Sequence, residues 1–213
     1  MKKAIDLSEY LVGKGEQFRF QLGDVLWSQG EEADSLLVVS TGVLKLQRRW
    51  PSGGQTILSL LSRGSIAGEE AVQTPPIRST SCVAIVQGKG FRISKKKLVQ
   101  ALEQPAVALS LVQLASKRQS QTLMRMEELL DGPVETRLAN TLIRLGRQMG
   151  ISDGRGQFIP VRLTRGELAE FIGCRAETTT RLMTKWKREG IVDTKREGIV
   201  IQNQPKLQTI ATG

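Results

Sequence analysis

Residues 163–192 read LTRGELAEFIGCRAETTTRLMTKWKREGIV, and this stretch predicts a helix, a sharp turn and a second helix. Thr164, followed three residues later by Glu167, forms the capping-box pattern that begins a helix. Gly173 supplies the positive-φ residue that ends the first helix, and Gly190 ends the second. The stretch therefore predicts a helix-turn-helix.

Three side chains of the second helix share one face, because Glu177, Thr180 and Arg181 are spaced at i, i+3 and i+4. A glutamate can accept from cytosine N4, an arginine can bind guanine O6 and N7, and a threonine adds a hydroxyl or methyl contact. On spacing alone, a solvated charged face explains these residues equally well. The sequence IVDTKREGIVI over 191–201 favours DNA reading, since two β-prone runs around a basic turn indicate a wing beside the helices.

This stretch resembles the winged helix-turn-helix of the cyclic AMP receptor protein and fumarate-nitrate reductase regulator family of bacterial transcription factors, and the resemblance extends over nearly the whole chain. It implies that Glu177 and Arg181 read base edges. Thr180 just before Arg181 is similar to the fumarate-nitrate branch, which implies a TTGA-like half-site rather than a TGTGA-like one. Six basic residues are candidates for contacts to DNA phosphates: Arg165, Arg175, Lys185, Lys187, Lys195 and Arg196.

The composition limits the chemistry. The formal net charge of +10 favours a polyanionic partner. The chain has no histidine, which excludes a histidine base, a histidine-ligated haem and a histidine-rich zinc site. Cys82 and Cys174 are too few for an iron-sulfur cluster within one chain; we expect structural thiols, with a redox role as the alternative. No nucleophile and base pair, metal-binding constellation or Walker-type loop indicates an enzyme.

No apolar run is long enough to span a bilayer, and the first ten residues, MKKAIDLSEY, lack an apolar signal segment. We therefore expect a cytoplasmic protein without membrane association.

Residues from about 18 to 93 consist of short β-prone runs separated by glycines, which predicts a small sandwich or roll with a hairpin tip at 50–55. This pattern resembles the cyclic-nucleotide-binding jelly roll of the same family. The resemblance implies effector contacts through Gly68, Glu69, Arg78 and Ser79. Backbone amides and a guanidinium are suitable groups for binding a cyclic phosphate.

Three further residues bear on the effector. The resemblance places Thr122 where the cyclic AMP receptor protein contacts adenine. Two departures oppose it: Glu70 adds negative charge near the place of the phosphate, and Leu123 cannot hydrogen-bond a base. A switch driven by cyclic AMP, a response to another small metabolite and a regulator without any effector therefore remain alternatives.

The residues after Pro105 predict one long helix with a two-stranded coiled-coil seam. The seam residues are Ala108, Val112, Ala115, Gln119, Thr122, Met126 and Leu129. In the family this helix forms the dimer interface, so the resemblance implies a homodimer. A helix that packs only on its own roll is the alternative.

The expected fold class is α+β in three parts: a jelly-roll sensor domain over 1–103, a dimerisation helix and hinge over 104–132, and a winged helix-turn-helix domain over 133–213. Asp131-Gly132-Pro133 should break the long helix. A helix is expected over 134–149, a polar loop over 150–156 and a strand over 158–163. Residues after Asn203 show no strong pattern and predict a mobile tail.

Together these features predict a homodimeric regulator that binds an inverted repeat in double-stranded DNA. Activation and contact with RNA polymerase are implied by the family. A cyclic-nucleotide-binding module that works through protein partners is the remote alternative, and the helix-turn-helix argues against it.

Overall fold

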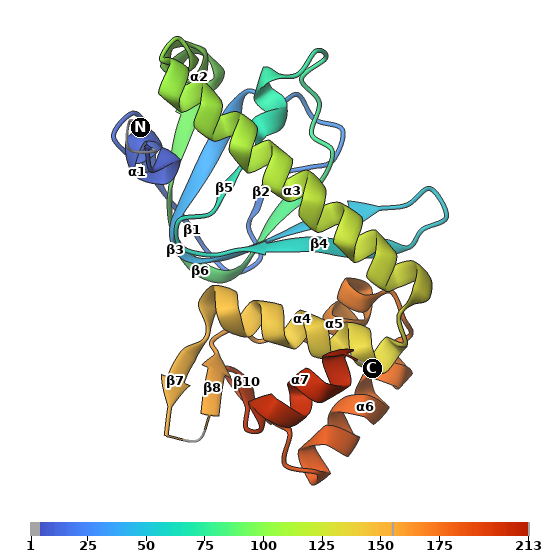
Figure 1. The fold of residues 1–213 in the computed structure, drawn as a ribbon. Helices are drawn as coiled ribbons and strands as arrows, with labels where there is room; N and C mark the ends of the chain where they lie inside the picture. The colour runs from blue at the N-terminus through green and yellow to red at the C-terminus, as the bar shows by residue number, and fades with distance from the viewer. Residues whose placement is uncertain (1–4, 155, 213) are drawn as a thin grey trace. The chain divides into compact units, whose positions relative to one another are not determined.

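The computed structural model describes residues 5–154 and 156–212, and it confirms the predicted α+β class. Contacts between residues divide the chain into two compact units, 1–123 and 124–213. The long helix α3 (Pro105–Asp131) contributes to both units (Figure 1).

The first unit is built on one antiparallel sheet with the order β1-β6-β3-β4, in which β2 also pairs with β6 and β5 with β3. The strands are β1 (Glu16–Phe20), β2 (Val25–Trp27), β3 (Ser35–Arg49), β4 (Gln55–Leu61), β5 (Ile66–Ala67) and β6 (Ser81–Ser94). Two β-prone runs on either side of Gly42 form the single strand β3. Gly42 has φ +82°, and a Cβ there would lie 2.6 Å from the Gln87 carbonyl oxygen. The backbone of β3 at this position therefore requires glycine.

The predicted hairpin tip joins β3 to β4. The Trp50 amide donates to the Gly54 oxygen at 2.7 Å, and the Gly53 amide donates to the Trp50 oxygen at 2.9 Å. These bonds confirm the turn at 50–55.

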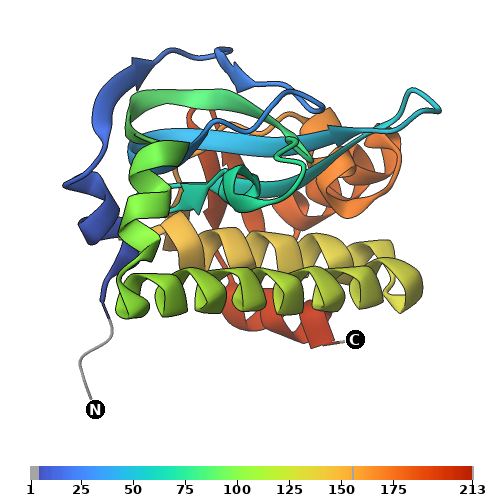
Figure 2. The same cartoon turned by 90° about the horizontal axis from the view of Figure 1, so that it is seen from above.

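Helices α1 (Leu7–Val12), α2 (Lys95–Leu102) and the first turns of α3 share one hydrophobic core with the roll. Figure 2 shows α1, α2 and the start of α3 at the same end of the roll. Leu11, Leu36, Leu98 and Val107 are at most 1% exposed in it. A one-turn 3-10 helix, η1 (Glu69–Val72), follows β5. Burial of four large aliphatic side chains is worth roughly 6 to 12 kcal/mol before the entropy of ordering is subtracted.

The second unit contains α4 (Val134–Met149), β7 (Ile151–Asp153), β8 (Gly156–Ile159), α5 (Arg165–Ile172), α6 (Ala176–Arg188), β9 (Val192–Lys195), β10 (Gly198–Ile201) and α7 (Gln204–Thr212). Its strands form an antiparallel sheet with the order β7-β8-β10-β9. The break between α3 and α4, the helix over 134–149 and the wing hairpin β9–β10 are confirmed.

Three expectations for this unit were wrong. The polar loop expected over 150–156 contains β7, a strand of three residues that is too short to show a sequence pattern. The strand expected over 158–163 ends at Ile159, because Pro160 has no N–H for the ladder.

The tail expected after Asn203 is instead the helix α7. Asn203 Oδ1 accepts from the Lys206 amide at 3.0 Å, and Leu207 is fully buried. The Thr136 hydroxyl of α4 donates to the Ile210 oxygen at 3.1 Å. With one buried leucine, the sequence of α7 shows too little hydrophobic periodicity to predict a helix. Asn203, however, is a typical N-cap residue and could have indicated where the helix begins.

No single helix in the described residues is long and apolar enough to cross a membrane. Only α2 and α3 taken together, across a bend of 112°, pass the same test of length and composition.

Candidate nucleic-acid interface and effector cradle

The helix-turn-helix forms as the local sequence predicts. The Thr164 hydroxyl accepts from the Glu167 amide at 3.1 Å, and the Glu167 carboxylate accepts from the Thr164 amide at 3.0 Å, so both halves of the capping box are present. Gly173 ends α5 with φ +66°. These two local signals fix where the turn places α6.

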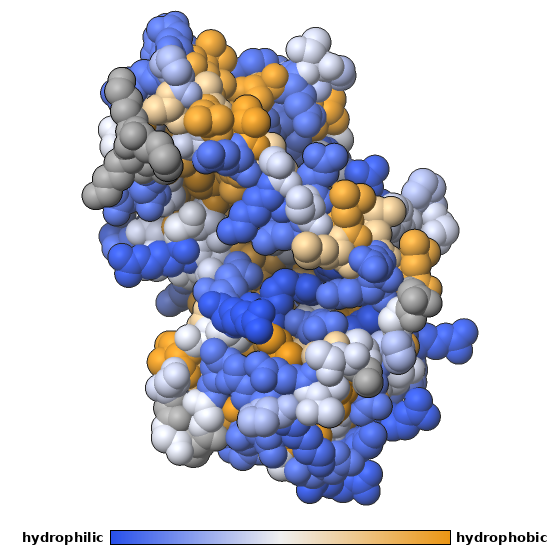
Figure 3. Space-filling model, in the orientation of Figure 1, coloured by the Kyte–Doolittle hydropathy of each residue, from blue (hydrophilic) through white to orange (hydrophobic). Residues whose placement is uncertain are grey.

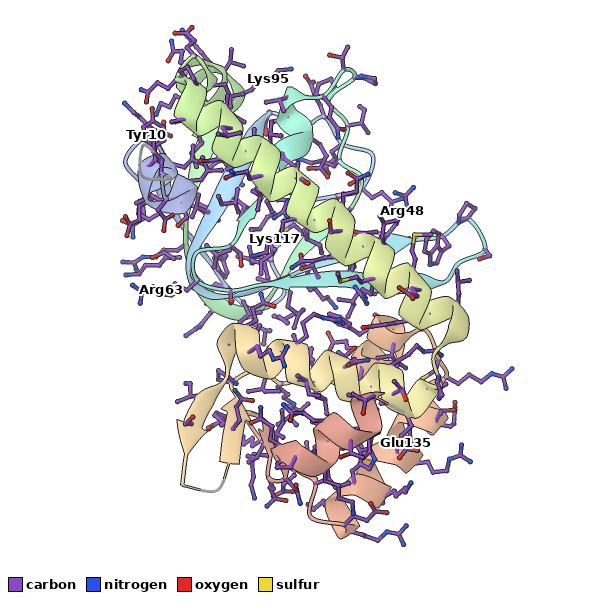
Figure 4. All side chains as sticks on the ribbon, viewed as in Figure 1. Tyr10, Arg48, Arg63, Lys95, Lys117 and Glu135 are labelled. Atoms are coloured by element: carbon purple, nitrogen blue, oxygen red, sulfur yellow. The ribbon has the colours of Figure 1, made fainter. Side chains whose placement is uncertain are left out.

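Helix α6 has two distinct faces. Leu182, Met183 and Trp186 are buried, and the Trp186 side chain is fully enclosed. Trp186 Nε1 donates to Glu135 Oε1 at 3.0 Å, and Lys185 Nζ lies 3.0 Å from the same oxygen. Glu135 lies at the start of α4 (Figure 4), so one carboxylate connects α6 to α4.

The opposite face of α6 is exposed and carries Glu177, Thr180 and Arg181. The Thr180 hydroxyl donates to the Ala176 oxygen at 2.9 Å, which satisfies its proton within the helix. Thr184 and Arg188 are also exposed and extend this face at i+7 and i+11 from Glu177. The sequence analysis missed both, although the same helical spacing identifies them. Figure 3 shows a hydrophilic surface in the region that α6 occupies in Figure 1.

Four of the six candidate phosphate contacts have partners within the chain. Arg165 is half-buried and donates to the Thr194 hydroxyl at 3.0 Å, which ties α5 to the wing, and burial lowers its pKa. Lys185 pairs with Glu135. Lys195 and Lys187 share Asp193, with Lys187 Nζ 3.0 Å from Oδ1.

Hydrogen bonds from Lys195 and then from Lys187 lower the pKa of Asp193 to about 2. The other two candidates, Arg175 at the N-cap of α6 and Arg196 in the wing turn, are exposed. Neither has an ion-pair partner among the described residues, so their charges are fully available to a ligand.

Two arginines that the sequence analysis missed attach the last turns of α3 to the helix-turn-helix. The Arg125 guanidinium lies 4.4 Å from the centroid of the Phe171 ring and donates to the Phe171 oxygen. Burial lowers the pKa of Arg125 to about 10. Arg137 donates to the Leu129 oxygen at 3.1 Å and to the Gly173 oxygen at 3.4 Å. The end of α3 and the turn before α6 are therefore held together.

The structure brings Gly68, Glu69, Arg78 and Ser79 together in the roll. Arg78 is only 2% exposed, and its Nη2 donates to the Ser35 oxygen at 2.7 Å. Gly68 has φ +94°, and a Cβ there would lie 2.6 Å from Arg78 Nη1. Glycine at 68 thus makes room for the guanidinium.

Arg78 also packs on Trp27, with its guanidinium carbon 4.2 Å from the ring centroid. Two carboxylates lie nearby: Asp34 Oδ1 is 3.5 Å from Nη2, and Glu70 Oε2 is 3.9 Å from Nη1. Burial lowers the pKa of Arg78, while Glu70 and Asp34 oppose that shift. The charge of Arg78 is therefore balanced by carboxylates of the same chain.

The remaining effector candidates are Glu69 and Thr122, which lie on η1 and α3. Glu69 forms an ion pair with Arg118 of α3, and Arg118 also donates to the Ile66 oxygen. Thr122 lies one helical turn beyond Arg118 and is exposed. Sequence reasoning missed Arg118, because 49 residues separate it from its partner.

Two family models match the chain. The cyclic nucleotide-binding domain matches residues 17–105, and the Crp-like helix-turn-helix domain matches residues 136–210. The chain belongs to the cyclic AMP receptor protein and fumarate-nitrate reductase regulator family. Members of this family are transcription regulators with a DNA-binding helix-turn-helix.

The curated relatives include regulators with different roles. The chain is 22% identical over 189 residues to the CRP-like cAMP-activated global transcriptional regulator of Mycobacterium tuberculosis, covering 88% of this chain and 84% of the relative. It is 28% identical over 192 residues to the global nitrogen regulator of Synechococcus elongatus, covering 89% and 86%.

Solved structures share the fold. FixK2 from Bradyrhizobium japonicum superposes with a TM-score of 0.82 at 18% identity, covering 92% of this chain and 96% of that one. The c-di-GMP responsive regulator CLP of Xanthomonas campestris gives a TM-score of 0.76 at 20% identity, covering 92% and 98%. Family membership therefore leaves the effector open.

Proposed function

We propose that the protein is a homodimeric transcription activator that binds an inverted repeat with TTGA-like half-sites. The observation that carries this proposal is the exposed face of α6, where Glu177, Thr180 and Arg181 lie on a helix that Trp186 anchors from behind. An arginine with no ion-pair partner among the described residues is available to bind guanine, and a glutamate beside it to accept from cytosine. Activation through RNA polymerase is the family behaviour that we carry over.

The wing and the N-cap of α6 supply the phosphate contacts in this proposal. Arg175 and Arg196 bind phosphates directly, while Arg165 positions the wing through Thr194. Lys185, Lys187 and Lys195 add charge that their carboxylate partners reduce. Such contacts position the protein on the duplex and make binding dependent on salt.

The proposed dimer forms along α3, which is about 40 Å long at ~1.5 Å per residue. Three of the seam residues are exposed apolar side chains: Val112 is 63% exposed, Met126 52% and Leu129 38%. A second copy of the helix would cover them. The division of labour we propose assigns residues 1–103 to sensing, 104–132 to dimerisation and 133–213 to DNA binding.

A two-fold dimer would place its two α6 helices about one turn of B-DNA apart, roughly 34 Å between half-site centres. Selection from a randomised duplex pool at one salt concentration should therefore yield an inverted repeat with that spacing. Recovery of a single half-site, or of a direct repeat, would contradict the proposed dimer.

The base-reading role is tested with Arg181→Ala, with Arg147→Ala as the matched control because it removes the same charge from an exposed position on α4. We expect Arg181→Ala to lose ~1 to 3 kcal/mol per half-site, or about 5- to 150-fold, on the selected operator. On scrambled DNA, Arg181→Ala should lose as much affinity as the control Arg147→Ala does. If Arg181→Ala discriminates the two duplexes as well as the parent protein does, Arg181 does not read bases.

A further inference from the structure

Three donors of the roll converge on one carboxylate. The Ser79 hydroxyl donates to Glu70 Oε1 at 2.6 Å, and the Ser79 amide donates to the same oxygen at 3.4 Å. Arg78 Nη1 lies 3.9 Å from Glu70 Oε2. A buried guanidinium, a hydroxyl and a backbone amide that meet at one point form an anion site.

This site lies inside the segment that matches the cyclic nucleotide-binding domain. We propose that Glu70 determines the ligand specificity of the roll: its carboxylate is a tethered anion that fills the Arg78–Ser79 site and prevents the site from binding the phosphate of a cyclic nucleotide.

Charge and tethering both support this inference. The Glu70 side chain is 12% exposed, so a phosphate at the Ser79 hydroxyl would face a second negative charge in a poorly hydrated position. Glu70 is also attached to the same chain, so its effective concentration at the site is far above that of a free metabolite. An incoming anion must displace a partner that is always present.

The Arg78–Ser79 site retains donors for an anion once that carboxylate is removed. Arg78 Nε is buried and has no hydrogen-bond partner among the described residues. Arg78 therefore still has an unsatisfied donor, and a phosphate presents more acceptor oxygens than a carboxylate does.

A neighbouring ion pair connects two elements of the first unit. Glu69 contacts Arg118, which joins η1 to the long helix α3 directly. A bound nucleotide is not needed to bridge these two elements. DNA binding by the parent protein should consequently be the same with and without cyclic AMP, a consequence that rests on the proposed function.

The experiment titrates cyclic AMP into the full-length protein and its variants by isothermal calorimetry. We expect no heat of binding from the parent at millimolar nucleotide. Glu70→Ala should bind with a dissociation constant at least tenfold below the highest nucleotide concentration tested on the parent. Glu103→Ala removes an equal charge from an exposed position at the end of α2 and should behave as the parent. Glu70→Gln, which keeps the shape of the side chain, provides a second test if Glu70→Ala does not fold.

Adding Ser79→Ala to Glu70→Ala should weaken the new binding, because it removes the hydroxyl that now contacts Glu70. Binding of cyclic AMP by the parent as tightly as by the Glu70 variants would overturn the inference, and so would the absence of binding by both variants. Failure of the proposed function would look different: no operator would be selected, whereas the titration would still decide the role of Glu70.

Discussion

Arg78 and Arg181 are both arginines, but they differ in burial and in the partners of their guanidinium groups. Arg78, in the roll, is 2% exposed and lies among Ser35, Trp27 and Glu70. Arg181, on α6, is exposed and has no ion-pair partner among the described residues. The comparison teaches that a motif residue is available to a ligand only when the chain itself has left it without partners.

The largest expected difference between the two arginines is in their contribution to the free energy of unfolding. Arg78→Ala leaves a cavity in the core of the roll and removes the cation beside the mostly enclosed Glu70 carboxylate, so we expect the free energy of unfolding to fall by about 3 kcal/mol or more. Arg181→Ala removes an exposed side chain and should change it by less than about 0.5 kcal/mol. Urea unfolding followed by circular dichroism, at one protein concentration, measures both. Equal losses would show that Arg78 does not hold the roll together.

The second effect compares two cations of the wing. Arg196→Ala should reduce the slope of log K against log salt by about 1 per chain, because it removes an uncompensated charge from a proposed phosphate contact. Lys195→Ala should reduce it less, since Lys195 shares Asp193 with Lys187.

Fluorescence anisotropy on a non-specific duplex at several salt concentrations gives both slopes. Identical slopes for the two variants would mean that the pairing with Asp193 does not persist when DNA binds.

The smallest expected difference is in the reactivity of the two thiols, Cys82 in the first unit and Cys174 in the second. Burial raises the pKa of Cys82 to about 12, so almost none of it is thiolate at pH 8, whereas Cys174 is partly exposed near the turn before α6. Iodoacetamide should therefore modify Cys174 alone in the native protein. Mass spectrometry of the digested product checks this. A native adduct on Cys82 would mean that the roll opens at this strand.

The sequence predicted the helix-turn-helix because its signals are local. Thr164 and Glu167 are three residues apart, and Gly173 needs no partner to adopt a positive φ. The same reasoning could not find that Lys185 pairs with Glu135, 50 residues away. Such contacts depend on how the elements pack, which periodicity does not encode.

The effector cradle shows the same limit in a different form. The resemblance to the family implied that Gly68, Glu69, Arg78 and Ser79 lie in one site, and the structure brings them together. The sequence also identified Glu70 as an added negative charge. Only the folded roll shows that the Glu70 carboxylate accepts a hydrogen bond from Ser79, which lies nine positions later in the chain.

The two faces of α6 are independent in a way that has a practical use. Its buried side chains hold the helix against α4 and α5, while the outward positions 177, 180, 181, 184 and 188 are all exposed. Those five positions can be exchanged as a set without altering the packing beneath them. Under the proposed base-reading role, the domain is a scaffold whose operator sequence can be reprogrammed, with the parent fold retained as the constant part of a library.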